Sequence, residues 1–85
     1  AFITMQEVWV QMLVKVKLFA NFRKNRFKEK EMDLEDNCTV GWVIDYLKIP
    51  RKELGVVFLN GLSTTPEAIL HAGDTLSIFP MVGGG

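Results

Sequence analysis

This 85-residue chain is poor in the side chains that most enzyme sites need, with one cysteine and one histidine. The single cysteine, Cys38, cannot form an intramolecular disulfide, and no second cysteine or histidine stands near it at metal-ligand spacing. Its place before a predicted helix can lower a thiol pKa, but a lone cysteine in a turn is more often inert. His71 has no evident serine or cysteine partner, and we interpret it as a turn residue. The sequence therefore predicts no metal site and no independent catalytic centre.

The chain also lacks net charge and long apolar runs. Ten Lys and Arg balance ten Asp and Glu, so the surface as a whole does not attract a polyanion, and nucleic acid is not an expected partner. The basic run Arg23-Lys24-Asn25-Arg26 is a local exception, which we interpret as a solvated loop. No apolar run approaches the roughly twenty residues that cross a bilayer, and the first twenty residues do not resemble a signal peptide. We expect a cytoplasmic protein with no membrane partner.

What the sequence does contain is a pattern of about four strands. Residues 14–19 alternate apolar and other side chains with period two, and residues 27–34 predict a charged second strand. Residues 55–59 are apolar on both parities, which predicts a strand buried on both faces or near the sheet centre. Asn60-Gly61 is a turn signal, and residues 75–80 supply the last strand. The predicted inward side chains are Val14, Val16, Leu18, Met32, Leu34, Leu76 and Ile78.

One helix is predicted between the second and third strands. Thr39 is a suitable N-cap, and Ile49-Pro50 ends the helix because proline disfavours helical geometry in the residue before it. Trp42 and Tyr46 lie on a flank, where we expect them to pack against the chain's first residues, with Trp9 as a candidate, rather than to bind a ligand. The apolar stripe consists of Val40, Val43, Ile44 and Leu47. One helix lying across one sheet describes an α+β roll.

The end of the sequence is glycine-rich. Gly83, Gly84 and Gly85 directly follow the last predicted strand. Glycine has no Cβ, so such a stalk can thread a narrow channel in a second protein and present its terminal carboxylate there. The alternative is a frayed end or a cloning remnant. We therefore divide the sequence into an extension or vector remnant at 1–11, a domain at 12–80 and a flexible tail at 81–85.

Five segments resemble the ubiquitin-like β-grasp sulfur carriers, represented by the small subunit of molybdopterin synthase (MoaD) and the thiamin-pathway carrier ThiS. The segments are VKLFA at 16–20, TVGWV at 39–43, LNG at 59–61, HAGDTL at 71–76 and FPMVGGG at 79–85. Each segment alone is a weak indication of the family, but all five in this order are fairly specific for it. The likeness covers residues 14–85. The resemblance implies a ubiquitin-like β-grasp roll, a mixed sheet of four to five strands covered by one main helix.

The resemblance also implies a chemistry for the tail. A ubiquitin-activating-type adenylyltransferase would use ATP to convert the carboxylate of Gly85 into an acyl-adenylate, which then becomes a thiocarboxylate. Gly84 and Gly83 would give clearance in the partner's channel, while Met81 and Val82 would anchor the base of the stalk. The chain would bind no cofactor of its own, because ATP belongs to the partner's site, and it would be a protein co-substrate rather than an enzyme.

Further partners follow from the same resemblance. They are a sulfur donor such as a cysteine desulfurase, and either the molybdopterin synthase large subunit or a thiazole synthase. The partner-binding patch would include Phe19 and Phe79, which point away from the predicted buried face, together with Pro80 and Leu62. Partial covering of each phenylalanine by neighbouring chain is the alternative.

The pathway stays open in the sequence. Met81 stands where molybdopterin-type carriers often have a second proline, and Gly83 replaces the small residue commonly seen before the glycine pair. The Leu-Phe-Ala segment and the length favour molybdopterin biosynthesis over thiamin thiazole synthesis. A ubiquitin-like modifier conjugated through Gly85, and a plain binding module with an inert tail, are the remaining hypotheses.

Overall fold

The alternation predicted near the start of the chain sets the buried face of the sheet. In the computed structural model, which describes residues 12–82, strand β1 (Met12–Leu18) alternates buried and half-buried side chains along its whole length. Strand β2 (Glu29–Leu34) runs antiparallel to β1, with Lys17 opposite Glu29. It begins two residues later than predicted. Its apolar residues Met32 and Leu34 share the buried face of β1, as predicted.

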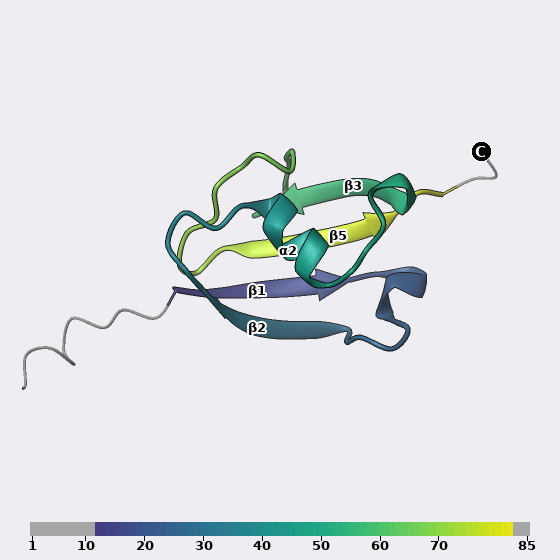
Figure 1. Ribbon diagram of the computed structural model, residues 1–85, viewed down its shortest axis with the longest axis horizontal. Helices are drawn as coiled ribbons and strands as arrows, with labels where there is room; N and C mark the ends of the chain where they lie inside the picture. Colours follow the sequence, from purple (N-terminus) through teal and green to yellow (C-terminus); the bar gives the residue numbers. More distant parts are fainter. Residues whose placement is uncertain (1–11, 83–85) are drawn as a thin grey trace, which may run out of the picture.

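The remaining strands complete a mixed five-stranded sheet in the order β2-β1-β5-β3-β4 (Figure 1). They are β3 (Leu54–Leu59), the two-residue β4 (Leu62–Ser63) and β5 (Thr75–Pro80). The first and last strands lie side by side and parallel, with Leu18 level with Ile78. Parallel pairing brings the carboxyl ends of β1 and β5 to the same end of the sheet.

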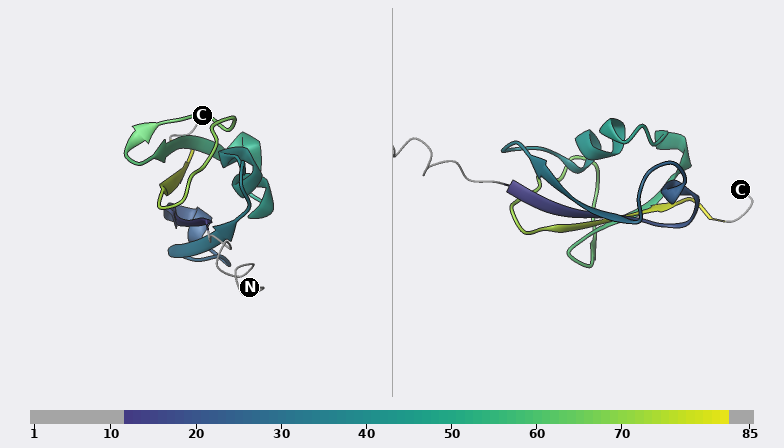
Figure 2. Two further views of the ribbon diagram at one scale, coloured as in Figure 1. Left: turned by 90° about the vertical axis from the view of Figure 1, so that its left-hand side faces the viewer. Right: turned by 90° about the horizontal axis from the view of Figure 1, so that it is seen from below.

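One α-helix, α2 (Val40–Tyr46), lies across a single face of this sheet (Figure 2, right). The Thr39 hydroxyl accepts a hydrogen bond from the Trp42 backbone N–H at 3.1 Å, which confirms the predicted N-cap. The helix ends at Tyr46, earlier than predicted. The physical reason is Lys48, which has a left-handed φ of 59° and cannot continue the helix. The short 3-10 helices η1 (Ala20–Arg23) and η2 (Arg51–Glu53) connect the larger elements.

The hydrophobic core fills the space between the sheet and the helix. Its fully buried side chains come from β1, α2, β5 and the segment before β5. Those with the least exposure are Val14, Val16, Leu18, Val40, Val43, Ile44, Leu70, Leu76 and Ile78. One helix on one mixed sheet confirms the β-grasp architecture and leaves the other face of the sheet uncovered by any described helix.

The third strand lies where it was predicted, but the prediction that it is buried on both faces was wrong. Within β3, Val57 is buried, while Gly55 and Val56 are exposed and the other residues are half-buried. The strand is flanked on one side by the two-residue β4, and no described helix covers its outer face. Its apolar residues on both parities therefore do not indicate burial on both faces.

The predicted Asn60-Gly61 turn joins β3 to β4. Both residues have positive φ, 53° and 84°, as in the two-residue hairpin turns that favour Asn-Gly. The Asn60 side-chain amide donates to the Asp74 carboxylate at 2.9 Å, and its carbonyl accepts the Thr75 N–H at 2.9 Å. The hairpin is thereby tied to the start of β5.

The helix presents two aromatic rings outward. Trp42 and Tyr46 stack on each other, with ring centroids 5.0 Å apart, and both are exposed in the described part of the chain. The expected packing against the first residues, including Trp9, falls on residues 1–11 and lies outside the described range. None of the helices at 12–82 is both long and apolar enough to cross a membrane.

Candidate functional site

The chain leaves the sheet at the end of the last strand. Strand β5 ends at Pro80, at the same end as the carboxyl end of β1 (Figure 1). Beyond it, Met81 and Val82 are exposed. The Met81 backbone N–H donates to the Glu53 carbonyl at 2.9 Å, so the first residue after the strand is still held by the body of the protein. We call Pro80 and Met81 the tail root.

Three phenylalanine rings gather beside the tail root on the outer face of the sheet. Phe19 and Phe79 stack with centroids 4.1 Å apart and planes 8° apart, and Phe58 meets Phe79 edge-on at 5.7 Å and 87°. Their neighbours Leu18 and Ile78 point into the core, so Phe19 and Phe79 point outward, as predicted from the sequence. We call the three rings the aromatic cluster. All three rings are half-buried.

Two arginines of the basic run make defined contacts, and one of them, Arg23, lies against the aromatic cluster. The Arg23 guanidinium carbon lies 5.2 Å from the Phe19 ring centroid, and its Nε donates to the Leu18 carbonyl at 2.7 Å. Arg26 donates to the carbonyls of Leu47 at 2.9 Å and of Phe22 and Lys48 at 3.1 Å each. Arg26 is half-buried, so the interpretation of this basic run as a solvated loop was wrong for Arg26. Arg23, Lys24 and Asn25 are exposed, as that interpretation predicts.

The rest of the outer face is charged. Lys15 and Lys17 of β1 stand opposite Glu31 and Glu29 of β2, and Lys15 Nζ lies 3.5 Å from a Glu29 carboxylate oxygen. These side chains are substantially exposed, so the pair contributes little to stability. The outer face thus has a charged part over β1 and β2 and an apolar part next to the tail root.

Leu62 does not join the aromatic cluster. It is paired with Leu59, whose side chain packs against the core, whereas Phe58 is paired with Ser63. Paired residues share a face of the sheet, so Leu62 lies on the opposite face from the three rings. It is 74% exposed on the short edge strand. Its role in partner binding stays a prediction.

The predicted reactive residues Gly83, Gly84 and Gly85 lie outside the described residues. Their roles as channel spacer and acyl carrier therefore stay predictions. The structure shows where the chain leaves the sheet and which side chains surround that point. Of the predicted site, it brings Phe19, Phe79, Pro80 and Met81 to one end of the molecule.

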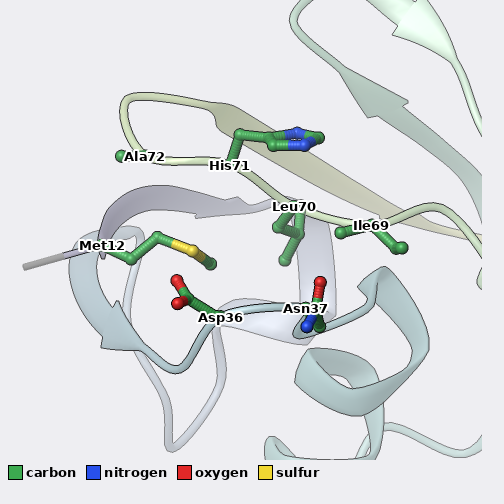
Figure 3. A pocket seen from close by; sticks show the side chains of 7 residues that line it. All are labelled: Met12, Asp36, Asn37, Ile69, Leu70, His71 and Ala72. Carbon is green, nitrogen blue, oxygen red and sulfur yellow. The ribbon is translucent and has the colours of Figure 1, made fainter.

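A cleft of about 270 Å³ lies near the start of β1, at the other end of the sheet (Figure 3). It is lined by Met12, Asp36, Asn37, Ile69, Leu70, His71 and Ala72. His71 lies in the turn before β5, as predicted, and its backbone N–H donates to the Asp74 carboxylate at 2.8 Å. Among the described residues, the lining contains no serine, threonine or cysteine.

Cys38 is half-buried just before α2. Burial, followed by the nearby Glu35 carboxylate, raises the pKa of its thiol. The direction is the opposite of the lowering that its position before a helix can cause. No group of three His, Cys, Asp or Glu side chains within residues 12–82 is placed to hold a metal ion.

Phe58 belongs to the aromatic cluster but was not predicted from the sequence. The available signal was the parity of β3, because Phe58 alternates with the buried Val57 and faces the same side as Phe79. Because β3 was predicted to be buried on both faces, Phe58 was not assigned to the outer face of the sheet. Arg23 was also missed, since its contact with Phe19 depends on η1 turning back at the end of β1.

Comparisons with known proteins agree with this architecture. A model of the ThiS family matches residues 16–85. A putative molybdopterin converting factor subunit 1 from Pyrococcus furiosus is 25% identical with a TM-score of 0.69, over 84% of this chain and 99% of that chain. SAMP1 from Haloferax volcanii is 26% identical with a TM-score of 0.67, over 86% and 99%.

A third similar structure is a chain in the complex of subunits 1 and 2 of the molybdopterin-converting factor from Helicobacter pylori. It is 22% identical with a TM-score of 0.60, covers 87% of this chain and 100% of that chain, and at this identity shows the fold alone. Among proteins with curated annotation, none matches this sequence significantly.

Proposed function

Since the chain belongs to the ThiS family of ubiquitin-like sulfur carriers, we propose that it carries sulfur as a thiocarboxylate on Gly85. The observation that carries this proposal is the extent of the family match, which runs through the three glycines to residue 85. The architecture supports it, because the tail root lies beside an apolar surface on which a partner can dock.

The chemistry begins with activation of the carboxylate by a partner. A carboxylate oxygen is a poor leaving group, so an adenylyltransferase joins it to the α-phosphorus of ATP and releases pyrophosphate. A persulfide on the sulfur donor, such as a cysteine desulfurase, then attacks the acyl carbon and displaces AMP. A thiol reduces the resulting acyl disulfide and frees the thiocarboxylate. This chain supplies the acyl group and the docking surface, and its partners supply the catalytic groups.

The aromatic cluster is the proposed docking surface for these partners. Aromatic and arginine side chains are enriched in protein interfaces, and Phe19, Phe79 and Arg23 offer both beside the tail root. A partner that grips the cluster holds the chain only two residues from Met81. The charged part over β1 and β2 then supplies a polar rim.

We propose molybdopterin biosynthesis as the pathway, with the synthase large subunit as the acceptor. This rests on the likeness to the Pyrococcus furiosus protein and on the sequence features noted above. The Helicobacter pylori relative is solved in complex with subunit 2, which suggests the kind of partner to test. Thiamin thiazole synthesis, with a thiazole synthase as acceptor, is the alternative, and the name of the matching family favours it.

A protein-modifier function is a second candidate. The observation that favours it is the likeness to SAMP1, a small archaeal modifier protein that is 26% identical to this chain. In that case the activated Gly85 would pass to a lysine amine. Recovery of this chain in isopeptide linkage to other proteins from cells supports conjugation, whereas recovery exclusively as free acid or thiocarboxylate contradicts it.

The proposal is tested by intact mass spectrometry. Incubation of the full chain with its activating partner, ATP and a persulfide donor should add the mass of one sulfur atom minus one oxygen atom. A variant lacking Gly85, or carrying one bulky residue after it, should fold normally and stay unconverted. No mass change in the wild-type chain, under conditions that convert a known carrier, refutes the proposal. Addition of the large subunit or the thiazole synthase then identifies which acceptor removes the sulfur.

A further inference from the structure

Gly55 lies directly against the backbone of the tail root. A Cβ built on Gly55 would stand 2.4 Å from the Pro80 carbonyl oxygen, 2.6 Å from the Pro80 carbonyl carbon and 2.9 Å from the Met81 nitrogen. All three atoms belong to one peptide unit of the main chain, which cannot swing aside as the end of a flexible side chain can. Any other residue at this position would therefore displace the Pro80-Met81 peptide.

The strand pairing explains the close approach. Leu54 pairs with Pro80 and Val57 pairs with Ile78, so two residues of β3, Gly55 and Val56, stand opposite the single residue Phe79. An extra residue of this kind is a β-bulge, which bends the strand and changes the direction of its neighbours. Here the bulge lies where β5 ends and the tail begins.

A hydrogen bond from another part of the chain also holds the Pro80-Met81 peptide. The Met81 N–H, which belongs to the Pro80-Met81 peptide, donates to the Glu53 carbonyl at 2.9 Å. Gly55 limits how close this peptide lies to β3, and the Glu53 carbonyl fixes its orientation. Phe79, one residue earlier, is held on its outer side by the rings of Phe19 and Phe58. The chain is thus fixed up to the point where it leaves the sheet.

We propose that Gly55 is a positioning residue that sets the direction in which the tail leaves the sheet, relative to the aromatic cluster. This inference rests on the proposed function, since direction matters only if the tail must enter a partner's active site. A partner docked on the aromatic cluster receives the terminal glycine at a place determined by the tail root. A shift of the root displaces the acyl group from the attacking position while leaving the docking surface intact.

The size of the shift follows from the contact distances. Ordinary contact with a Cβ begins at 3.4 Å, so the Pro80 oxygen would have to retreat by about 1 Å from its 2.4 Å position. Misplacement of a reacting group by about 1 Å can slow a reaction by about 100-fold. Three glycines follow Val82, and the wide range of backbone conformations open to glycine should reduce the loss in rate that the displaced tail root causes. We expect Gly55→Ala to lower the adenylation rate at saturating carrier by between about 10- and 100-fold.

The matched control is Gly41→Ala in α2. A Cβ there would also be crowded, at 2.8 Å from an Arg51 side-chain nitrogen and 3.2 Å from the Pro66 carbonyl oxygen, but these contacts are on the helix side of the molecule. Both variants replace a crowded glycine by alanine and should lose stability. They are compared at a temperature and urea concentration where denaturation curves show each to be fully folded.

Two measurements decide the proposal. The first is hydrogen exchange of the Met81 amide by NMR, which should be slow in wild type and Gly41→Ala and at least 10-fold faster in Gly55→Ala. The second is steady-state adenylation, with pyrophosphate release as the readout. Gly55→Ala should lower kcat with little change in KM, whereas Gly41→Ala should change neither.

The outcomes separate this inference from the proposed function. If the Met81 amide exchanges alike in both variants, or if Gly55→Ala loses the protection and is still adenylated at the wild-type rate, the positioning role is refuted. An equal loss of adenylation in both variants refutes it as well, because the effect is then one of general stability. If wild type is not adenylated at all, the proposed function fails and with it the role of Gly55 in the reaction, while the exchange measurement still decides whether Gly55 holds the tail root.

Discussion

Replacement of Phe19 and Phe79 by alanine, singly and together, should reveal a coupling free energy of about 1 kcal/mol between the two rings. The rings are nearly parallel, 8° apart, with centroids 4.1 Å apart, a geometry for which aromatic pairs contribute about 0.5–1.5 kcal/mol beyond the area they bury. Each side chain is half-buried, and burial of a whole Phe stabilises by about 1.5–3 kcal/mol. Each single variant should therefore lose about 2–3 kcal/mol of unfolding free energy, since each also loses a second contact.

The assay is urea denaturation followed by far-UV circular dichroism, with unchanged m-values as the condition for comparing midpoints. A loss of this size lowers the melting temperature of a domain of this length by about 10 °C or more. The control cycle combines Phe19→Ala with Leu62→Ala. These residues lie on opposite faces of the sheet and should add within about 0.5 kcal/mol. A Phe19–Phe79 coupling no larger than that of the control pair would refute the stacked cluster.

Three further changes test other parts of the structure. Arg26→Ala removes three hydrogen bonds to backbone carbonyls and should lower the free energy of unfolding, measured by urea denaturation, by about 2 kcal/mol. Arg26→Lys should recover only part of this loss. A loss under about 0.5 kcal/mol in Arg26→Ala would contradict the structural role of the guanidinium. Thr39→Ala should cost about 1 kcal/mol by the same measurement, because the Trp42 N–H loses its acceptor, while Thr39→Ser should retain most of the stability; equal losses would argue against the cap. Burial raises the pKa of the Cys38 thiol, so at pH 7–8 less of it is thiolate than in a free cysteine. Iodoacetamide should therefore alkylate the folded protein more slowly than the urea-unfolded chain at these pH values, and the difference should shrink once the pH exceeds the raised pKa. Faster alkylation of the folded protein near pH 7 would show that the pKa is lowered instead.

Local patterns in the sequence were sufficient for most of the fold. Period-two alternation identified β1 and β5 and their buried faces, and Thr39 marked the start of the helix. These features depend on residues close in sequence and on the preference of apolar side chains for one face. The helix end was missed because it depends on the left-handed backbone of Lys48, a conformation that a lysine in the sequence does not predict.

The candidate site was predicted less completely, because it depends on pairing between distant strands. The outward direction of Phe19 and Phe79 followed from parity, but their stacking required the parallel pairing of β1 and β5. Leu62 was assigned to the same patch because it follows a turn, and only the register of β3 with β4 places it on the other face. The close approach of Gly55 to the tail root depends on a β-bulge, which no local pattern in residues 54–59 specifies.

The most direct test of the account is the intact mass of the protein isolated from its own cells, with and without the gene for its activating partner. A fraction of the chains from intact cells should carry the mass of one sulfur atom in place of one oxygen atom, and fragmentation should assign the change to Gly85. This fraction should disappear without the activating partner. A protein found solely with a free carboxylate in both strains, under conditions that preserve a known thiocarboxylate, would contradict the central claim.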